Sequence, residues 1–170
     1  RRNFETYLRL ERGRAANSVG AYLQDYDHLS RYMVEQGKEP EQVELRDLQQ
    51  LLKSFADINI APASQRRMIA GWRMFYKMLV VEDALKDSPA DLLDLPIRPK
   101  HLPDVLNDDE ITAIQATFDR STPDGERNYV IVEVLYGCGL RVSELVNMKL
   151  SNIYADEQML RIIGKGDKER

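Results

Sequence analysis

The sequence predicts a mainly α-helical fold, in which a small helical bundle is followed by a proline-rich linker and the beginning of a mixed α/β domain. Three observations support this prediction. Apolar residues recur every three or four positions through the first ninety-odd residues, as they do on one face of a helix. Four prolines then lie between residues 89 and 103. The last twenty residues alternate short apolar runs with turn-forming residues, which is typical of short strands.

Four helices are expected in the first domain, which we assign to residues 1–95. They span residues 3–13, 18–37, 43–58 and 62–81. The second of them is expected to begin at an N-cap supplied by Asn17 or Ser18, because short polar side chains accept hydrogen bonds from the first N–H groups of a helix. The side chains of the first helix that are expected to face the core are Phe4, Tyr7, Leu8 and Leu10.

The helix expected at residues 62–81 carries two different stripes. Its apolar stripe consists of Met68, Ile69, Trp72, Phe75, Tyr76 and Leu79. On another face Arg66, Arg73 and Lys77 lie nearly in line, at intervals of seven and four residues. Such a basic stripe is either the solvated surface of an amphipathic helix or a face that contacts phosphates, and the pattern alone favours solvated surface.

The linker is assigned to residues 96–104, and residues 105–170 are assigned to the first part of a second domain. Its first helix is expected to be capped by Asn107 or Asp108. Residues 128–139 are apolar almost all round and long enough to predict a buried helix, although their β-branched residues leave a strand possible. Two short strands are expected around a turn at residues 155–157. The apolar side chains expected to pack inward in this domain are Ile111, Ile114, Phe118, Val142, Leu145 and Val146.

The composition excludes several classes of protein. No apolar run has the length of a membrane span or a secretory signal, and a single cysteine rules out an internal disulfide framework, so a cytoplasmic protein is expected. The two histidines, His28 and His101, have no cysteine or histidine cluster around them, so neither a metal nor another cofactor is expected. The net charge of −4 is weak evidence against nucleic-acid binding, since a local basic face is what contacts phosphates.

Three charged residues near the end of the chain lie where local structure gives little reason for them. Arg141 follows two glycines and begins a short helix, where the partial positive charge of the helix end disfavours a cation. Glu144 lies one turn later, close enough to pair with Arg141 and direct its guanidinium. Lys165 lies between two glycines at an expected hairpin tip. Taken singly, the pair is an ordinary helical ion pair and the lysine an ordinary turn residue.

Their combination closely resembles the catalytic domain of the tyrosine recombinases, above all the bacterial Xer group. The stretch "LYGCGLRVSELVNMKLSNI" resembles the "TGLRxSEL" box of that family, and "LRIIGKGDKER" resembles its "GKGxKER" hairpin. The earlier stretches "SVGAYLQDYDHLSRYM", "SQRRMIAGWRMFYKML" and "HLPDVLNDDEI" are similar to the helices and domain junction that precede these boxes. The resemblance therefore covers essentially the whole chain.

The resemblance implies a fold and a set of roles. Residues 1–95 would form a four-helix SAM-like core-binding domain that grips duplex DNA, followed by the start of the catalytic domain. Arg141 would hold the scissile phosphate, Lys165 would protonate the 5′-oxygen leaving group, and Glu144 would orient Arg141. Arg66, Arg73 and Lys77 become tentative phosphate contacts. Four protomers, identical or of two kinds, would exchange strands on two DNA sites through a 3′-phosphotyrosyl intermediate, without a cofactor.

The family's later motifs, a His-x-x-Arg box and the nucleophilic tyrosine, do not occur in these 170 residues, so this piece alone is expected to be inactive. The Xer group implies resolution of chromosome dimers, with a cell-division DNA translocase as a further partner. A mobile-element integrase or invertase of the same family, and a non-catalytic DNA-binding remnant, remain alternatives. A helical protein-interaction module without a DNA role is a third alternative, which the acidic charge balance favours.

Overall fold

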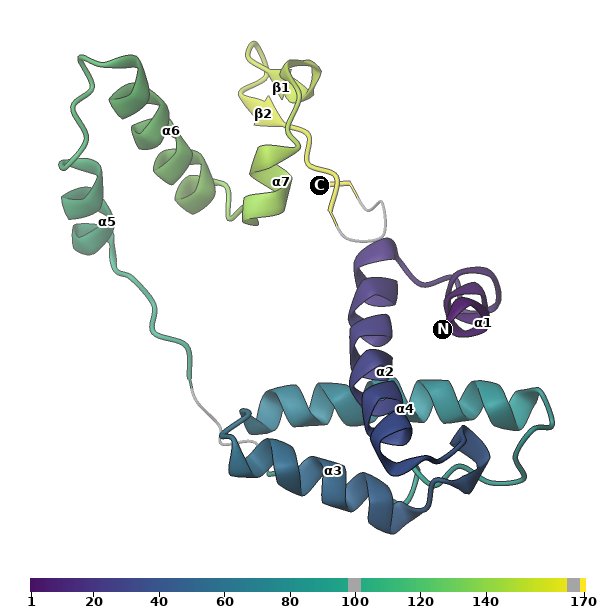
Figure 1. Ribbon diagram of the computed structural model, residues 1–170. Helices are drawn as coiled ribbons and strands as arrows, with labels where there is room; N and C mark the ends of the chain where they lie inside the picture. The colour runs from purple at the N-terminus through teal and green to yellow at the C-terminus, as the bar shows by residue number, and fades with distance from the viewer. Residues whose placement is uncertain (98–101, 165–168) are drawn as a thin grey trace. The chain divides into compact units, whose positions relative to one another are not determined.

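The computed structural model describes residues 1–97, 102–164 and 169–170. The chain forms two compact units, Arg1–His101 and Leu102–Arg170. Helices dominate both, as the sequence predicts, and the strands among the described residues lie in the second unit (Figure 1). Among the described helices, none combines the length and the apolar character needed to cross a lipid bilayer.

The first unit is built around two long helices, α2 (Ala16–Gln36) and α4 (Pro62–Val81). Figure 1 shows α2 running across α4, and α3 (Leu45–Asp57) lies alongside α4. A short α1 (Arg2–Thr6) continues into a π-helical turn, η1 (Tyr7–Glu11), and a 3₁₀ turn, η2 (Pro40–Gln42), leads into α3. Pro62 occupies the first turn of α4, where its missing N–H breaks no hydrogen bond.

Aromatic side chains fill the core of the first unit. The Phe75 ring lies 4.8 Å from that of Tyr26, 5.3 Å from that of Tyr76 and 5.5 Å from that of Phe4, measured between ring centroids. Trp72 is fully buried, and its indole N–H donates to the carbonyl of Asp25 at 3.0 Å. Every member of the apolar stripe predicted on α4 is buried, so the prediction of that face is confirmed.

Two details at the start of the chain differ from the expectation. The N-cap of α2 is Ala15 with extended backbone, and Asn17 and Ser18 already lie in the first turn, so no side chain caps this helix. Leu10 is 79% exposed. It follows the buried Leu8 by two residues, which places it on the opposite side of the helical turn.

A buried carboxylate marks the place where α2 and α4 approach each other. The Asp25 side chain is fully buried, and Gly71 of α4 lies against it so closely that a Cβ at residue 71 would lie 2.5 Å from the Asp25 Cβ. The Arg67 guanidinium reaches both carboxylate oxygens at 2.8 and 2.9 Å. Burial still raises the pKa of Asp25 to about 6, against the lowering effect of Arg67.

The second unit contains three helices among its described residues, α5 (Asp108–Gln115), α6 (Pro123–Gly137) and α7 (Val142–Val146). A 3₁₀ turn, η3 (Leu150–Asn152), leads to the two-stranded antiparallel pair of β1 (Ile153–Tyr154) and β2 (Met159–Leu160), in which Ile153 pairs with Leu160. The turn predicted at residues 155–157 connects these strands. Asn107 caps α5 as predicted, since its side chain accepts from the N–H of Glu110 at 2.9 Å.

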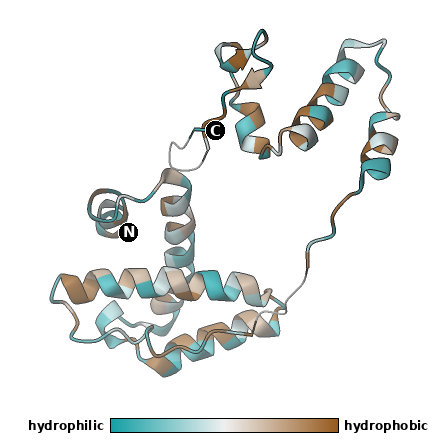
Figure 2. Ribbon diagram, turned by 180° about the vertical axis from the view of Figure 1, so that it is seen from behind, coloured by the Kyte–Doolittle hydropathy of each residue, from teal (hydrophilic) through white to brown (hydrophobic). Residues whose placement is uncertain are grey.

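Burial in the second unit is much lower than expected. The helix predicted at residues 128–139 exists, but Gly125 is the only buried residue of α6, and Val130 is 46% exposed. Val142 and Val146 are also exposed, so their predicted inward packing is wrong, and Ile114 is exposed at the margin. Figure 2 shows hydrophobic residues in brown along α6. A helix that is apolar on all sides needs neighbours on all sides, and within the described residues α5 and α7 contact only part of its surface.

Candidate active site and basic pocket

Arg141 occupies the N-cap position of α7, directly after a sharp corner in the chain. The corner is made at Gly139, whose φ of +58° lies in the left-handed region that glycine enters without strain. The next residue, Leu140, is buried and its N–H donates to the carbonyl of Leu135 at 3.1 Å. The anchored Leu140 and the corner together hold Arg141 at the surface, where 64% of its side chain is exposed.

Glu144 holds Arg141 at two points. One carboxylate oxygen accepts the Arg141 backbone N–H at 2.8 Å, and the other accepts the Arg141 Nη1 at 2.8 Å. The first contact is half of a capping box, and it satisfies an N–H at the start of α7. These contacts, the Arg141 backbone N–H first, lower the pKa of Glu144 against the opposing effect of its desolvation. A carboxylate held in this way keeps its charge and fixes the direction of the guanidinium.

A third charged residue, which the sequence analysis did not single out, joins this pair. Arg170 donates from Nη2 to Glu144 Oε2 at 2.8 Å and to the carbonyl of Gly139 at 3.2 Å. The Glu144 side chain is only 6% exposed between the two exposed guanidiniums. Arg170 closes the "GKGDKER" stretch, so its place at the end of that motif was the one signal in the sequence.

Lys165 lies outside the described residues, but the residues that flank its segment are paired. Ile163 and Glu169 form an antiparallel bridge. The Ile162 N–H donates to the Arg170 carbonyl at 2.8 Å, and the Arg170 N–H donates to the Ile162 carbonyl at 2.9 Å. Ile162 is buried, which fixes this pair to the body of the unit.

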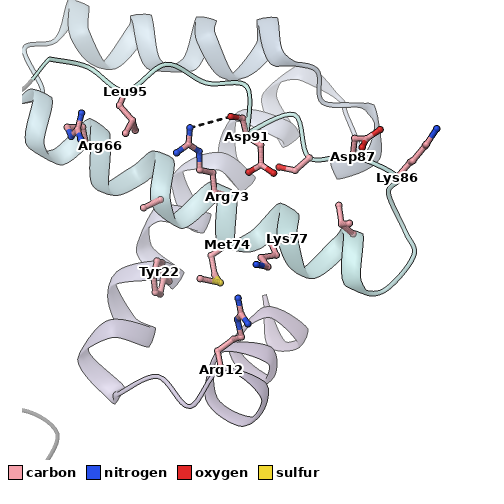
Figure 3. A pocket seen from close by; sticks show the side chains of 13 residues that line it. Arg12, Tyr22, Arg66, Arg73, Met74, Lys77, Lys86, Asp87, Asp91 and Leu95 are labelled. Atoms are coloured by element: carbon pink, nitrogen blue, oxygen red, sulfur yellow. Dashed lines mark hydrogen bonds between the residues drawn. The ribbon is translucent and has the colours of Figure 1, made fainter.

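The basic stripe predicted on α4 borders a pocket of about 700 Å³ in the first unit (Figure 3). Two of the three predicted residues, Arg66 and Arg73, donate hydrogen bonds to backbone carbonyls. Arg66 donates to the Pro96 carbonyl at 2.9 Å, and Arg73 donates to the carbonyls of Ala90 at 3.1 Å and Leu93 at 2.7 Å. They therefore hold the segment after α4 against the helix.

Lys77 forms no ion pair or hydrogen bond among the residues that the structure describes. In Figure 3 it lies in the same hollow as Arg12, which the sequence analysis did not single out because it comes from the distant end of η1. Lys86 also lines the pocket, and Asp87 and Asp91 oppose these cations in part. The pocket is therefore basic on balance, in a chain whose net charge is −4. Within residues 1–97, 102–164 and 169–170, no three His, Cys, Asp or Glu side chains are grouped as metal ligands.

Comparison with known proteins gives two family matches, which together cover most of the chain. Residues 2–83 match the model described as "Phage integrase, N-terminal SAM-like domain", and residues 104–170 match the model described as "Phage integrase family". The two matches follow each other in the order that the sequence resemblance implies.

The chain is also similar to curated relatives along nearly its whole length. It is 38% identical over 168 residues to the tyrosine recombinase XerD of Lacticaseibacillus casei, which covers 99% of this chain and 57% of that protein. It is 38% identical over 161 residues to the XerD of Proteus mirabilis, which covers 95% of this chain and 51% of that protein. The chain thus spans little more than half the length of these relatives.

Solved structures share the fold. A lambda integrase dimer (residues 75–356) bound to a COC′ core site matches with a TM-score of 0.78 and 18% identity, over 99% of this chain and 59% of that one. The Tn1549 transposon integrase (aa 82–397, R225K) in complex with a circular intermediate DNA matches with a TM-score of 0.62 and 14% identity, over 98% of this chain and 55% of that one. From the ordered family matches and the XerD relatives, the chain belongs to the phage integrase family, the tyrosine recombinases.

Proposed function

We propose that the chain is part of a Xer-type site-specific recombinase, which binds duplex DNA and cuts and rejoins its strands through a 3′-phosphotyrosyl intermediate. Residues 1–95 would be the core-binding domain, residues 96–104 the linker and residues 105–170 the first part of the catalytic domain. The observation that supports this most strongly is the Arg141 guanidinium, aimed by a nearly buried Glu144 and still exposed to solvent.

In the proposed reaction Arg141 binds the non-bridging oxygens of the scissile phosphate. A guanidinium offers paired N–H donors that match a phosphate, and a preset donor stabilises the charge that builds up as phosphorus becomes five-coordinate. A tyrosine oxygen attacks phosphorus, the bond to the 5′-oxygen breaks, and Lys165 supplies the proton that this oxygen takes up. All eight tyrosines of residues 1–170 precede Lys165, whereas the nucleophilic tyrosine of the family follows that motif. We therefore do not expect these residues alone to cleave DNA.

The basic pocket is the proposed contact of the first unit with the DNA backbone. Lys77 is the clearest candidate, because its ammonium is not used by any described residue, and Arg12 lies in the same hollow. Arg66 and Arg73 are half-buried, and no described residue accepts a hydrogen bond from Arg66 Nη2 or Arg73 Nη1. Contacts of this kind give affinity without sequence preference, and they release condensed cations from DNA.

The names of the relatives support a specific biological role within the family. Similarity to XerD recombinases favours a role in resolving chromosome dimers, with a cell-division DNA translocase as a partner. A lambda integrase tetramer has been solved on a Holliday junction with the same fold, which supports the proposal of four protomers, identical or of two kinds, acting on two sites. A mobile-element integrase would use the same residues for the same reaction. Recombination of the ends of a mobile element, and not of a chromosomal site, would favour that alternative.

The test compares two arginines of the same unit in the whole protein. The Arg141 and Arg127 side chains are equally exposed, and each forms an i,i+3 ion pair, at 2.8 and 3.1 Å. Arg141→Ala should lower single-turnover cleavage of a nicked duplex site by about 100-fold or more, because it removes a preset oxyanion donor, and should leave gel-shift affinity within a few-fold. Arg127→Ala should change neither. Loss of binding as large as the loss of cleavage would overturn the role in the transition state.

A further inference from the structure

The strongest unassigned feature of the second unit is the contact between Arg170 and Glu144. Arg170 lies 26 residues from Glu144 in sequence, yet its Nη2 reaches the Glu144 Oε2 at 2.8 Å. The same carboxylate oxygen also accepts the Arg141 backbone N–H, while the other carboxylate oxygen accepts the Arg141 side chain. Both oxygens of Glu144 are therefore engaged, and the carboxylate has no freedom to turn without losing a charged hydrogen bond.

Charge gives the third residue a role that the pair alone does not have. Arg141 and Glu144 by themselves form a neutral pair, which offers a phosphate little net attraction. With Arg170 the cluster carries a net charge of about +1, because a single carboxylate is shared by two guanidiniums. Arg170 neutralises part of the negative charge of Glu144, so the positive potential of Arg141 is reduced less and remains available to an anionic ligand.

Arg170 also links the corner, the short helix and the hairpin. Its side chain donates to the carbonyl of Gly139, the residue whose left-handed conformation turns the chain toward Arg141. Its backbone is paired on both sides with the buried Ile162. The backbone pair of Ile162 and Arg170 is thereby joined through one guanidinium to the segment that carries Arg141.

We propose that Arg170 is a positioning residue for phosphoryl transfer, which acts through Glu144 and Gly139 to aim Arg141 and to keep the cluster positive. The inference rests on the proposed function, because it assumes that Arg141 binds the scissile phosphate. Arg170 is expected to affect the chemical step and not the affinity for the site.

The test uses the whole protein and measures single-turnover cleavage at saturating DNA together with gel-shift affinity. Arg170→Ala should slow cleavage by about 10- to 100-fold, the usual range for a lost hydrogen bond to a charged group, with affinity changed less than about threefold. Arg170→Lys should recover part of the rate, because a lysine restores the charge. Arg161→Ala is the matched control, since Arg161 lies next to Ile162 in sequence, is similarly exposed and pairs with Glu169 instead. That control should cleave at close to the wild-type rate.

A double-mutant cycle distinguishes positioning from general support of the fold. In a Glu144→Gln background, Arg170→Ala should cost at most about threefold, because the carboxylate contact is already gone and only the hydrogen bond to the Gly139 carbonyl remains to be lost. Equal costs in the two backgrounds would overturn the proposal, and so would wild-type cleavage by Arg170→Ala while Arg141→Ala is inactive. If Arg141→Ala itself cleaves normally, the proposed function fails and not merely this inference. Circular dichroism and thermal unfolding of each variant show whether the fold is retained.

Discussion

The two units of this chain are stabilised in different ways. In the first, α2, α3 and α4 enclose a core of aromatic and aliphatic side chains around Trp72 and Phe75. In the second, Ile111, Leu140 and Ile162 are the buried apolar side chains among the described residues. The local shape of the second unit is held by polar contacts instead, namely the cap of α5 and the cluster around Glu144.

The contrast shows what each unit needs for its proposed task. A DNA-gripping domain has to keep its surface cations in place, and a packed core gives α4 that rigidity. The second unit needs two or three charged groups aligned to within a hydrogen-bond length, which side-chain and backbone hydrogen bonds provide locally. Its apolar surface on α6 and α7 is left open within these residues.

The largest effect is expected in the aromatic core. Phe75→Ala should lower the free energy of unfolding of the first unit by about 3–5 kcal/mol, since the ring fills space between three other aromatic rings. Trp72, the only tryptophan, provides a fluorescence signal for this unit. Val34→Ala, at a residue of α2 that is 79% exposed, should change the same quantity by less than about 0.5 kcal/mol. Equal effects of the two variants would contradict the packed aromatic core that we assign to the first unit.

The buried Asp25 is the polar exception in that core, and its effect depends on pH. Its folded pKa of about 6 lies above the unfolded value of 3.8, so the folded state binds the extra proton between these values. The contribution of Asp25 is therefore most favourable below about pH 4 and is lost as the pH rises through about 6, by up to roughly 3 kcal/mol.

Urea unfolding of the wild type and of Asp25→Asn at several pH values measures this contribution. As the pH rises from 4 to 6, the wild type should lose unfolding free energy relative to Asp25→Asn. Asp27→Asn, at an exposed carboxylate of the same helix, should retain the wild-type dependence. A difference that stays constant over this range would mean that the Arg67 pair outweighs burial.

The close approach of α2 and α4 predicts a further loss of stability. Gly71→Ala would place a Cβ 2.5 Å from the Asp25 Cβ, which cannot move away without separating the helices, so a loss of about 1–3 kcal/mol is expected. Gly20→Ala in α2 meets nothing within 4 Å and should raise stability by about 0.5–1 kcal/mol. The same fluorescence measurement serves both, and opposite signs are the expected result.

The smallest effect is expected in the second unit, and it tests whether polar contacts hold that unit. Asn107→Ala removes the side chain that caps α5 and should destabilise the helix by about 1 kcal/mol. Hydrogen exchange of the α5 amides gives the readout, with about fivefold faster exchange expected. Thr117→Ala, just past the end of α5, removes a hydroxyl that donates to the Ile114 carbonyl and caps no N–H group. It should leave the amides of the first turn unchanged.

Much of this architecture could be predicted from the sequence because it depends on local patterns. The apolar stripe of α4 is set by a repeat of three and four residues, and Pro62 and Asn107 mark helix starts by their own backbone chemistry. The pairing of Arg141 with Glu144 follows from their spacing along one helical turn. The position of Lys165 in the site stays a prediction, since residues 165–168 are not among those that the structure describes.

The sequence by itself determined the family, the helical periodicity and the local pairing of charges, since each is encoded within a few consecutive residues. Only the tertiary structure decided that Asp25 lies against Gly71, that Arg66 and Arg73 are used in part to hold backbone carbonyls, and that Arg170 reaches Glu144. These contacts join residues 17 to 46 positions apart, and a short-range pattern carries no information about which distant surfaces meet. The same reason explains the wrong expectation for Val142 and Val146, because an apolar side chain is buried only where another element covers it.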